Sequence, residues 1–245
     1  EELAWFDKYF FKTAKPDSEV VKEGSPLEGA FRAKNVARVE GRLGSSVGAK
    51  GKSALVPEVV KRGDLEIGRF EITRAQFSES DKAYKFAPGT ENYAANGITF
   101  DQANNYVSWL TKTTGQTWRI PYENEVSGFY EKKDGENTLD YWAGYTLNPD
   151  DAARLQKKAA ELGGSAPLLK SVGSFAGQGA SDEDLIYDLG GNVAEWVLMR
   201  DGKGKVIGGS ADCPADPKSN CTPAPEYVGF RVVRGAAKPA PEKQP

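Results

Sequence analysis

The spacing of apolar residues predicts three helices between residues 73 and 162 of this 245-residue chain. The clearest covers residues 99–114, where Thr99 and Gln102 have the spacing of a capping box. Gly115 can take the left-handed conformation that ends a helix. The apolar residues of this segment fall on one face, which we expect to be buried: Ala103, Tyr106, Val107 and Leu110. The other two predicted helices cover residues 73–80 and 149–162.

Capping residues mark the starts of the two shorter helices. Thr73 can cap the first, and Asn148 followed by Pro149 is a typical start for the second. Because the chain has 27 Gly and 14 Pro, turns and irregular connections should take up much of the remainder. Short apolar runs predict strands over residues 67–72, 117–120, 193–199 and 228–234.

Composition excludes several classes of protein. The chain contains no histidine, which rules out Ser-His-Asp and Cys-His catalysis and every metal site built on imidazole. Its net charge of −3 gives no electrostatic signature of binding to nucleic acid or to an anionic membrane. No apolar run approaches the length of a membrane span.

Residues 187–196 combine a turn with two carboxylates. Gly190 and Gly191 permit left-handed backbone conformations, so a tight turn can form between Asp188 and Glu195. The carboxylates and the carbonyl groups that the turn leaves unpaired can form an oxygen-only site for a hard cation, most naturally calcium. Alternatively, Asp188 caps local N–H groups and Glu195 is solvated, and the spacing alone favours this simpler arrangement.

The same segment, YDLGGNVAEW, resembles the YDxxGNVxEW motif of the formylglycine-generating-enzyme family, whose domains are also called sulfatase-modifying-factor domains. Six such motifs occur in the family's order over residues 71–234, which makes the resemblance specific. The other five are EITRAQF at 71–77, GITFDQANNYVSWL at 97–110, WRIPYENE at 118–125, GGS at 208–210 and GFRVVR at 229–234.

The resemblance implies a single irregular α+β domain over residues 26–236, similar to C-type lectin folds. Residues 1–25 are expected to form an N-terminal helix, over 3–12, and a linker. The helix weakly resembles the last helix of α/β-hydrolase-type peptidases, which would make this chain a domain of a longer protein. The Pro-rich residues 237–245 predict a disordered tail.

The resemblance also implies a structural calcium site in the turn. The family's ligands map onto the side chains of Asp188 and Glu195 and onto the carbonyl oxygens of Gly191 and Val193. Calcium in proteins takes roughly six to eight oxygen ligands at about 2.3–2.6 Å.

The two cysteines are where the chain departs from the family. Active members are copper-dependent oxidases that bind Cu(I) through two thiolates and convert a substrate cysteine to formylglycine. Cys213 stands at the first of these positions, but the second holds Lys218, and the other cysteine is Cys221. The chain therefore resembles a divergent member of the family.

Three arrangements are open to Cys213 and Cys221. Two cysteines close in sequence, in a chain that has no others, favour a disulfide, which requires an oxidising, extracytoplasmic compartment. The alternatives are a displaced Cu(I) site, since soft thiolates suit that ion, and two free thiols in a cytoplasmic protein.

We therefore expect a non-catalytic binding or accessory module, stabilised by calcium, with a protein, peptide or glycan as its ligand. The alternative is a copper-dependent oxidase that acts on a protein thiol through Cys213 and Cys221. By analogy with related scaffolds, the contact surface would lie near the GGS and GFR motifs. It would include Ser210, Asp212, Asn220, Tyr227 and Arg231.

Overall fold

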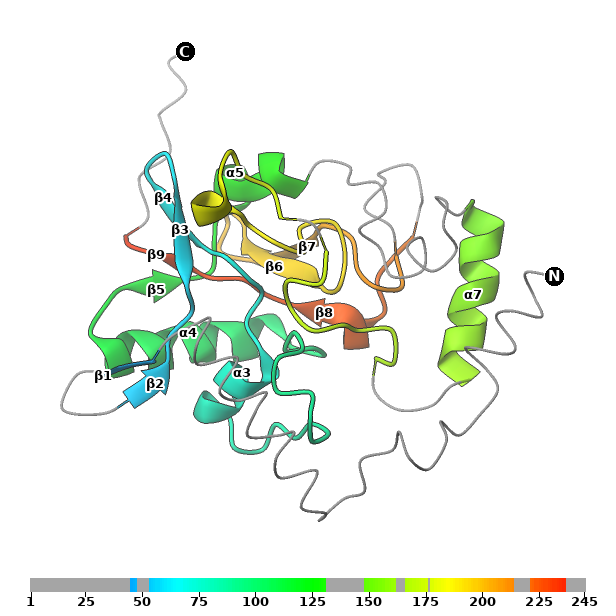
Figure 1. Cartoon of the computed structure of the whole chain (residues 1–245), viewed down its shortest axis with the longest axis horizontal. Coiled ribbons are helices and arrows are strands. Elements are labelled where there is room, and N and C mark those ends of the chain that lie inside the picture. The colour runs from blue at the N-terminus through cyan, green and yellow to red at the C-terminus, as the bar shows by residue number, and fades with distance from the viewer. Residues whose placement is uncertain are drawn as a thin grey trace.

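The computed structural model (Figure 1) combines helices with short strands, which is the α+β class expected from the sequence. The segments 1–25 and 237–245 lie outside the described residues, so the helix over 3–12, the linker and the tail stay predictions. The structure describes residues 45–47, 53–130, 148–161, 166–175, 177–213 and 221–236.

Short strands make up three sheets in the described residues. β1 (Ser45–Val47) and β2 (Ser53–Leu55) form an antiparallel pair. An antiparallel four-stranded sheet has the order β3 (Val59–Arg62), β4 (Leu65–Gly68), β9 (Val233–Arg234), β5 (Trp118–Arg119). The third sheet has β6 (Ala194–Leu198) at its centre, antiparallel to β7 (Gly204–Ile207) and parallel to β8 (Val228–Gly229).

The three predicted helices are confirmed as α3 (Arg74–Ser80), α4 (Phe100–Thr114) and α7 (Pro149–Glu161). Both predicted threonine caps form capping boxes, and in α4 the Gln102 backbone N–H donates to Thr99 Oγ1 at 3.2 Å. Gly115 ends α4 with a φ of 73°. Shorter helical turns are α5 (Glu123–Val126), η3 (Ser127–Tyr130), η4 (Asp182–Asp184) and η5 (Pro225–Tyr227).

Two predicted strands are wrong in their extent. The strand expected over 67–72 ends at Gly68, because the carbonyl of Arg69 turns away and accepts the N–H of Tyr187 at 3.0 Å. The strand expected over 228–234 is split into β8 and β9, which belong to different sheets. The crossing segment 230–232 thus links the two larger sheets. The predictions over 193–199 and 117–120 are confirmed within one or two residues at each end, as β6 and β5.

The apolar face of α4 holds the crossing segment in place. All four residues predicted for that face are buried, and Tyr106 contacts the ring of Phe230 edge-on, with centroids 5.4 Å apart. Phe77 of α3 stacks on Tyr106 at 5.9 Å, so both helices meet the same aromatic cluster. This packing fixes residues 230–232, and with them Arg231, against the core.

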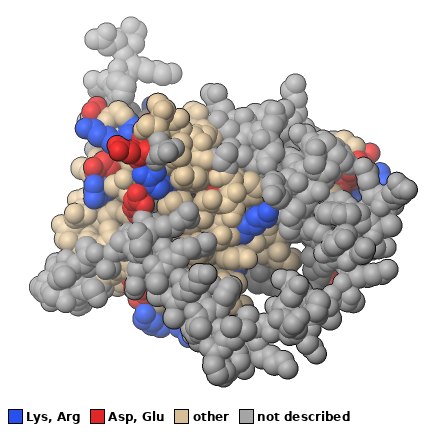
Figure 2. All heavy atoms as spheres, viewed as in Figure 1, with Lys and Arg blue, Asp and Glu red and all other residues tan. Residues whose placement is uncertain are grey.

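Charged side chains of both signs lie side by side over the β3–β4 hairpin, on the face that Figure 2 shows. They form ion pairs rather than a patch of one sign, since Arg62 contacts Asp184 and Arg69 contacts Glu58 at 2.8 Å. No helix in the described part of the chain is long and apolar enough to cross a membrane.

The cap of α4 makes a measurable prediction. Thr99 is exposed, so Thr99→Ala removes its capping bond without damaging the core, and we expect a loss of about 1 kcal/mol in the free energy of unfolding by urea. Lys112→Ala, at an exposed position of the same helix, should change stability by about 0.5 kcal/mol or less. Equal effects of the two substitutions would contradict the role of the cap.

Candidate functional site

The turn between residues 188 and 193 is built differently from the sequence expectation. The left-handed residues are Asp188, with a φ of 61°, and Asn192, with a φ of 62°, whereas neither Gly190 nor Gly191 has a positive φ. Asp and Asn tolerate this conformation because their short polar side chains can bond nearby backbone groups. Asp188 does so by accepting the N–H groups of Gly173 and of Phe175, the latter at 3.1 Å.

Glu71 accepts hydrogen bonds from the C-terminal end of this turn. Its carboxylate accepts Asn192 Nδ2 at 2.6 Å and the N–H of Val193 at 3.1 Å. Burial raises the pKa of Glu71 well above its usual range, and the negative charges of Asp188 and Glu195 raise it further. Sequence analysis missed this residue, although a lone carboxylate between the apolar Phe70 and Ile72 was a usable signal.

Beside the turn, a buried ion pair joins the two larger sheets. The side chains of Arg231 and Glu195 are 0% and 1% exposed, and Arg231 Nη2 lies 2.9 Å from Glu195 Oε1. Arg231 also donates from Nη1 to the carbonyl of Gly68 at 2.9 Å and from Nη2 to that of Tyr187 at 2.8 Å. Burial alone would lower the pKa of Arg231, but the Glu195 carboxylate and other neighbouring groups together outweigh it and raise that pKa, so Arg231 stays charged.

Tyr130 completes the surroundings of the pair. Its hydroxyl donates to Glu195 Oε2 at 2.5 Å, and burial together with the Glu195 charge raises the pKa of Tyr130 well above its usual range. Tyr130 is therefore a neutral donor. Both oxygens of Glu195 accept hydrogen bonds from protein groups, so a cation bound there would share Glu195 with Arg231 and Tyr130.

The four predicted calcium ligands fall in this one region. Asp188 and Glu195 both lie near enough to Glu71 to raise its pKa, and Gly191 and Val193 belong to the turn between them. Within the described residues, no three Asp, Glu or Cys side chains converge as a ready metal cluster. A calcium ion would therefore need backbone carbonyl oxygens as well as carboxylates, and the predicted ligand set includes two such carbonyl groups.

The two cysteines form a disulfide. Cys213 and Cys221 are eight residues apart in sequence, and their Cα atoms are 5.7 Å apart. Cys213 is buried, whereas Cys221 is partly exposed. Of the three arrangements left open by the sequence, the structure has the first.

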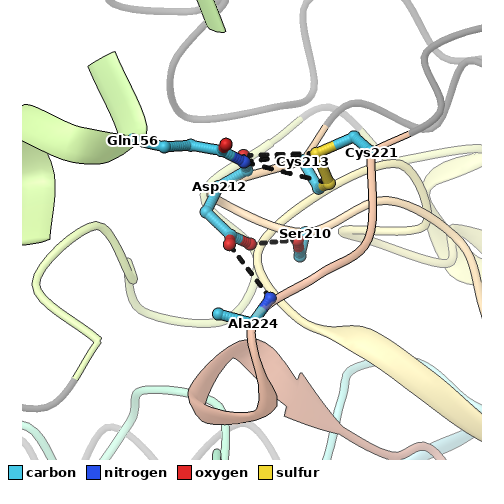
Figure 3. Close-up of a disulfide and its surroundings, with 6 residues drawn as sticks. All are labelled: Gln156, Ser210, Asp212, Cys213, Cys221 and Ala224. Carbon is cyan, nitrogen blue, oxygen red and sulfur yellow. Dashed lines mark hydrogen bonds between the residues drawn. A yellow bond between two sulfur atoms is a disulfide. The ribbon is translucent and has the colours of Figure 1, made fainter. Parts of the chain in front are cut away.

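Next to the disulfide, Asp212 ties two segments together (Figure 3). Its buried carboxylate accepts the hydroxyl of Ser210 at 2.5 Å and the N–H of Ala224 at 3.1 Å. Burial raises the pKa of Asp212, although these two hydrogen bonds partly offset the effect. The segments that enter and leave the disulfide loop are thus joined twice, by the sulfurs and by this carboxylate.

The residues predicted to contact a ligand are placed inside the protein wherever the structure describes them. Ser210, Asp212, Tyr227 and Arg231 are all buried and make internal hydrogen bonds. The Tyr227 hydroxyl, for example, accepts the N–H of Leu168 at 3.3 Å. Asn220 lies outside the described residues. These side chains support the region rather than form its surface.

Comparison with known proteins identifies the family. A model of the sulfatase-modifying factor enzyme 1-like domain matches residues 20–237, so the chain belongs to this family, as its six motifs indicated. Comparison with curated protein sequences gave no match.

Solved structures also match the chain. PvdO from Pseudomonas aeruginosa is 20% identical with a TM-score of 0.42, and the match covers 70% of this chain and 80% of PvdO. CarF is 16% identical with a TM-score of 0.36, and the match covers 73% of this chain and 93% of CarF.

Comparing two ion pairs tests the importance of the buried one. Arg231→Met leaves Glu195 buried without its cation, and we expect the free energy of unfolding to fall by about 3–5 kcal/mol. Arg234→Met removes a partly exposed pair with Glu66 and should cost about 1 kcal/mol or less. Urea denaturation of both variants measures the two losses in the free energy of unfolding. Similar losses would contradict the claim that the buried pair contributes more to stability than the exposed one.

Proposed function

We propose that this chain is a non-catalytic binding or accessory module of the sulfatase-modifying-factor family. The observation that carries the proposal is the disulfide between Cys213 and Cys221. The oxidases of this family bind Cu(I) through two cysteine thiolates, and a disulfide leaves none, because the chain has only these two cysteines. The chain also lacks histidine as a replacement ligand or base.

The surroundings of the disulfide support this assignment. Asp212, Ser210 and Ala224 form a hydrogen-bonded brace beside it, as expected for a structural crosslink. Segments fixed in this way lose little conformational entropy when a ligand binds, which favours recognition. A protein, peptide or glycan would meet the exposed neighbours of this brace, among them Thr222, Pro225 and Glu226.

A disulfide also bears on where the protein works. Such bonds persist in oxidising compartments and are rare in the cytosol. The proposal therefore places the protein outside the cytoplasm, in a periplasm or a secreted state.

The alternative function is a copper-dependent oxidase acting on a protein thiol. One observation favours it: Cys213 and Cys221 are close enough to be bridged, so reduction would place two thiols side by side. Linear coordination of Cu(I) by two thiolates would then be possible. In this alternative the two sulfurs of the working protein are thiolates rather than a disulfide.

Counting thiols separates the two functions. Unreduced protein, unfolded and treated with a thiol reagent, should show no free thiol and should take up no Cu(I), because both sulfurs are bridged. Reduced protein serves as the control and should show both thiols. The oxidase would be supported instead if unreduced protein had two reactive thiols and bound one Cu(I) that Cys213→Ser abolished.

A structural calcium ion is the second part of the proposal. Glu71, Asp188 and Glu195 are all buried, the charges of Asp188 and Glu195 act on Glu71, and Arg231 supplies one positive charge, to Glu195. Buried charge without compensation is costly, and a divalent cation on the Asp188 and Glu195 side chains would reduce that cost. The carbonyl oxygens of Gly191 and Val193 would complete the oxygen ligands that calcium prefers.

Chelation tests the calcium proposal. Calcium at about 100 times its dissociation constant should raise the Tm by roughly 5–10 °C, and EDTA should remove this gain. Asp188→Ala should abolish the difference between the two conditions, whereas Asp201→Ala, at an exposed carboxylate, should keep it. An unchanged Tm of the unsubstituted protein at low free calcium would refute the site.

A further inference from the structure

Helix α7 meets the rest of the molecule at the disulfide. It stands at the side of the view in Figure 1, away from α3 and α4, and its Leu155 packs against an apolar cluster of the core. Four charged residues of α7 pair within the helix, Arg154 with Asp151 and Lys158 with Glu161. Gln156 instead reaches across to the disulfide and the Asp212 carbonyl beside it (Figure 3).

The Gln156 side-chain amide faces both a backbone carbonyl oxygen and the sulfur atoms of the disulfide. Its Nε2 donates to the carbonyl oxygen of Asp212 and lies 3.2 Å from Sγ of Cys221 and 4.0 Å from Sγ of Cys213. Asp212 and Cys213 are neighbours in sequence, but Cys221 comes from a different segment. The disulfide is the covalent bond that keeps Cys221 beside the Asp212 carbonyl.

We propose that the Cys213–Cys221 disulfide is a redox-sensitive link that holds α7 against the domain through Gln156, and that a dithiol reductant releases the helix. Breaking the sulfur–sulfur bond lets Sγ of Cys221 move away from Sγ of Cys213, because nonbonded sulfur atoms repel each other at bonding distance, while the hydrogen bond from Ala224 to Asp212 still joins the two segments. Gln156 then loses Cys221 as a neighbour. The inference does not depend on the binding role proposed above.

The release follows ordinary thiol–disulfide exchange. A thiolate of the reductant attacks Sγ of the partly exposed Cys221, a mixed disulfide forms, and Sγ of the buried Cys213 leaves as a thiolate. The second thiol of the reductant then displaces Cys221 and closes the reductant's own disulfide. Two electrons pass from the reductant to the protein, and both cysteine sulfurs end with protons that the two reductant thiols gave up.

Amide hydrogen exchange measures the link directly. The full chain is compared before and after treatment with dithiothreitol, with peptides from α7 and from β6 followed by mass spectrometry. We expect exchange in residues 149–161 to become about fivefold faster or more on reduction, the size expected from losing one hydrogen bond. Peptides from β6 should change by less than about twofold, which shows that the domain stays folded.

Two substitutions locate the effect at Gln156. Gln156→Leu keeps the disulfide but removes the donor to both Asp212 and Cys221, so α7 in the oxidised variant should exchange at least as fast as in reduced wild-type protein, and reduction should add little. Lys157→Leu introduces a leucine at the exposed neighbouring position and should behave like wild type in both states. The double variant Cys213→Ser, Cys221→Ser should match the reduced protein without any reductant.

Three results would overturn the proposal. One is equal exchange of α7 in oxidised and reduced protein. Another is an oxidised Gln156→Leu variant whose α7 exchanges as slowly as wild type. The third is a disulfide that dithiothreitol reduces only under conditions in which β6 also loses its protection from exchange. Reduction would then require the domain to unfold, and the bond could not control α7 alone.

Discussion

The buried contact between Arg231 and Glu195 is the interaction on which the described structure depends. Arg231 donates to Glu195 of β6, to the carbonyl at the end of β4 and to the carbonyl of Tyr187 just before the central turn. One guanidinium therefore fixes three segments that are distant in sequence. Its burial is tolerable because most of its donors and both oxygens of Glu195 have partners, including the Tyr130 hydroxyl.

Local patterns in the sequence were enough to find the helices. The caps at Thr73 and Thr99 and the exit at Gly115 act within a few residues, so their effect can be recognised without the fold. The ends of the strands could not be found this way. Whether residues 228–234 form one strand or two depends on which sheets lie beside them, and that is a property of the whole domain.

The same limit applies to the candidate site. Spacing identified Asp188 and Glu195 as a pair, and the resemblance to a family singled out Arg231, but neither indicated that Arg231 and Glu195 bond to each other inside the protein. Glu71 was missed because patterns of polar residues usually mark the surface. Asp188 and Asn192 carry the left-handed backbone that glycine was expected to supply, since neighbouring groups satisfy their side chains.

The crossing segment has a consequence for the order in which the protein can be made. β9 lies between β4 and β5, and β8 pairs with β6. Both larger sheets are therefore incomplete until residues 228–234 have been made. On the ribosome, β4, β5 and β6 all emerge before these partners exist. The domain can therefore close only after residues 228–234 have left the ribosome, and until then its open strand edges are exposed to chaperones and to mispairing.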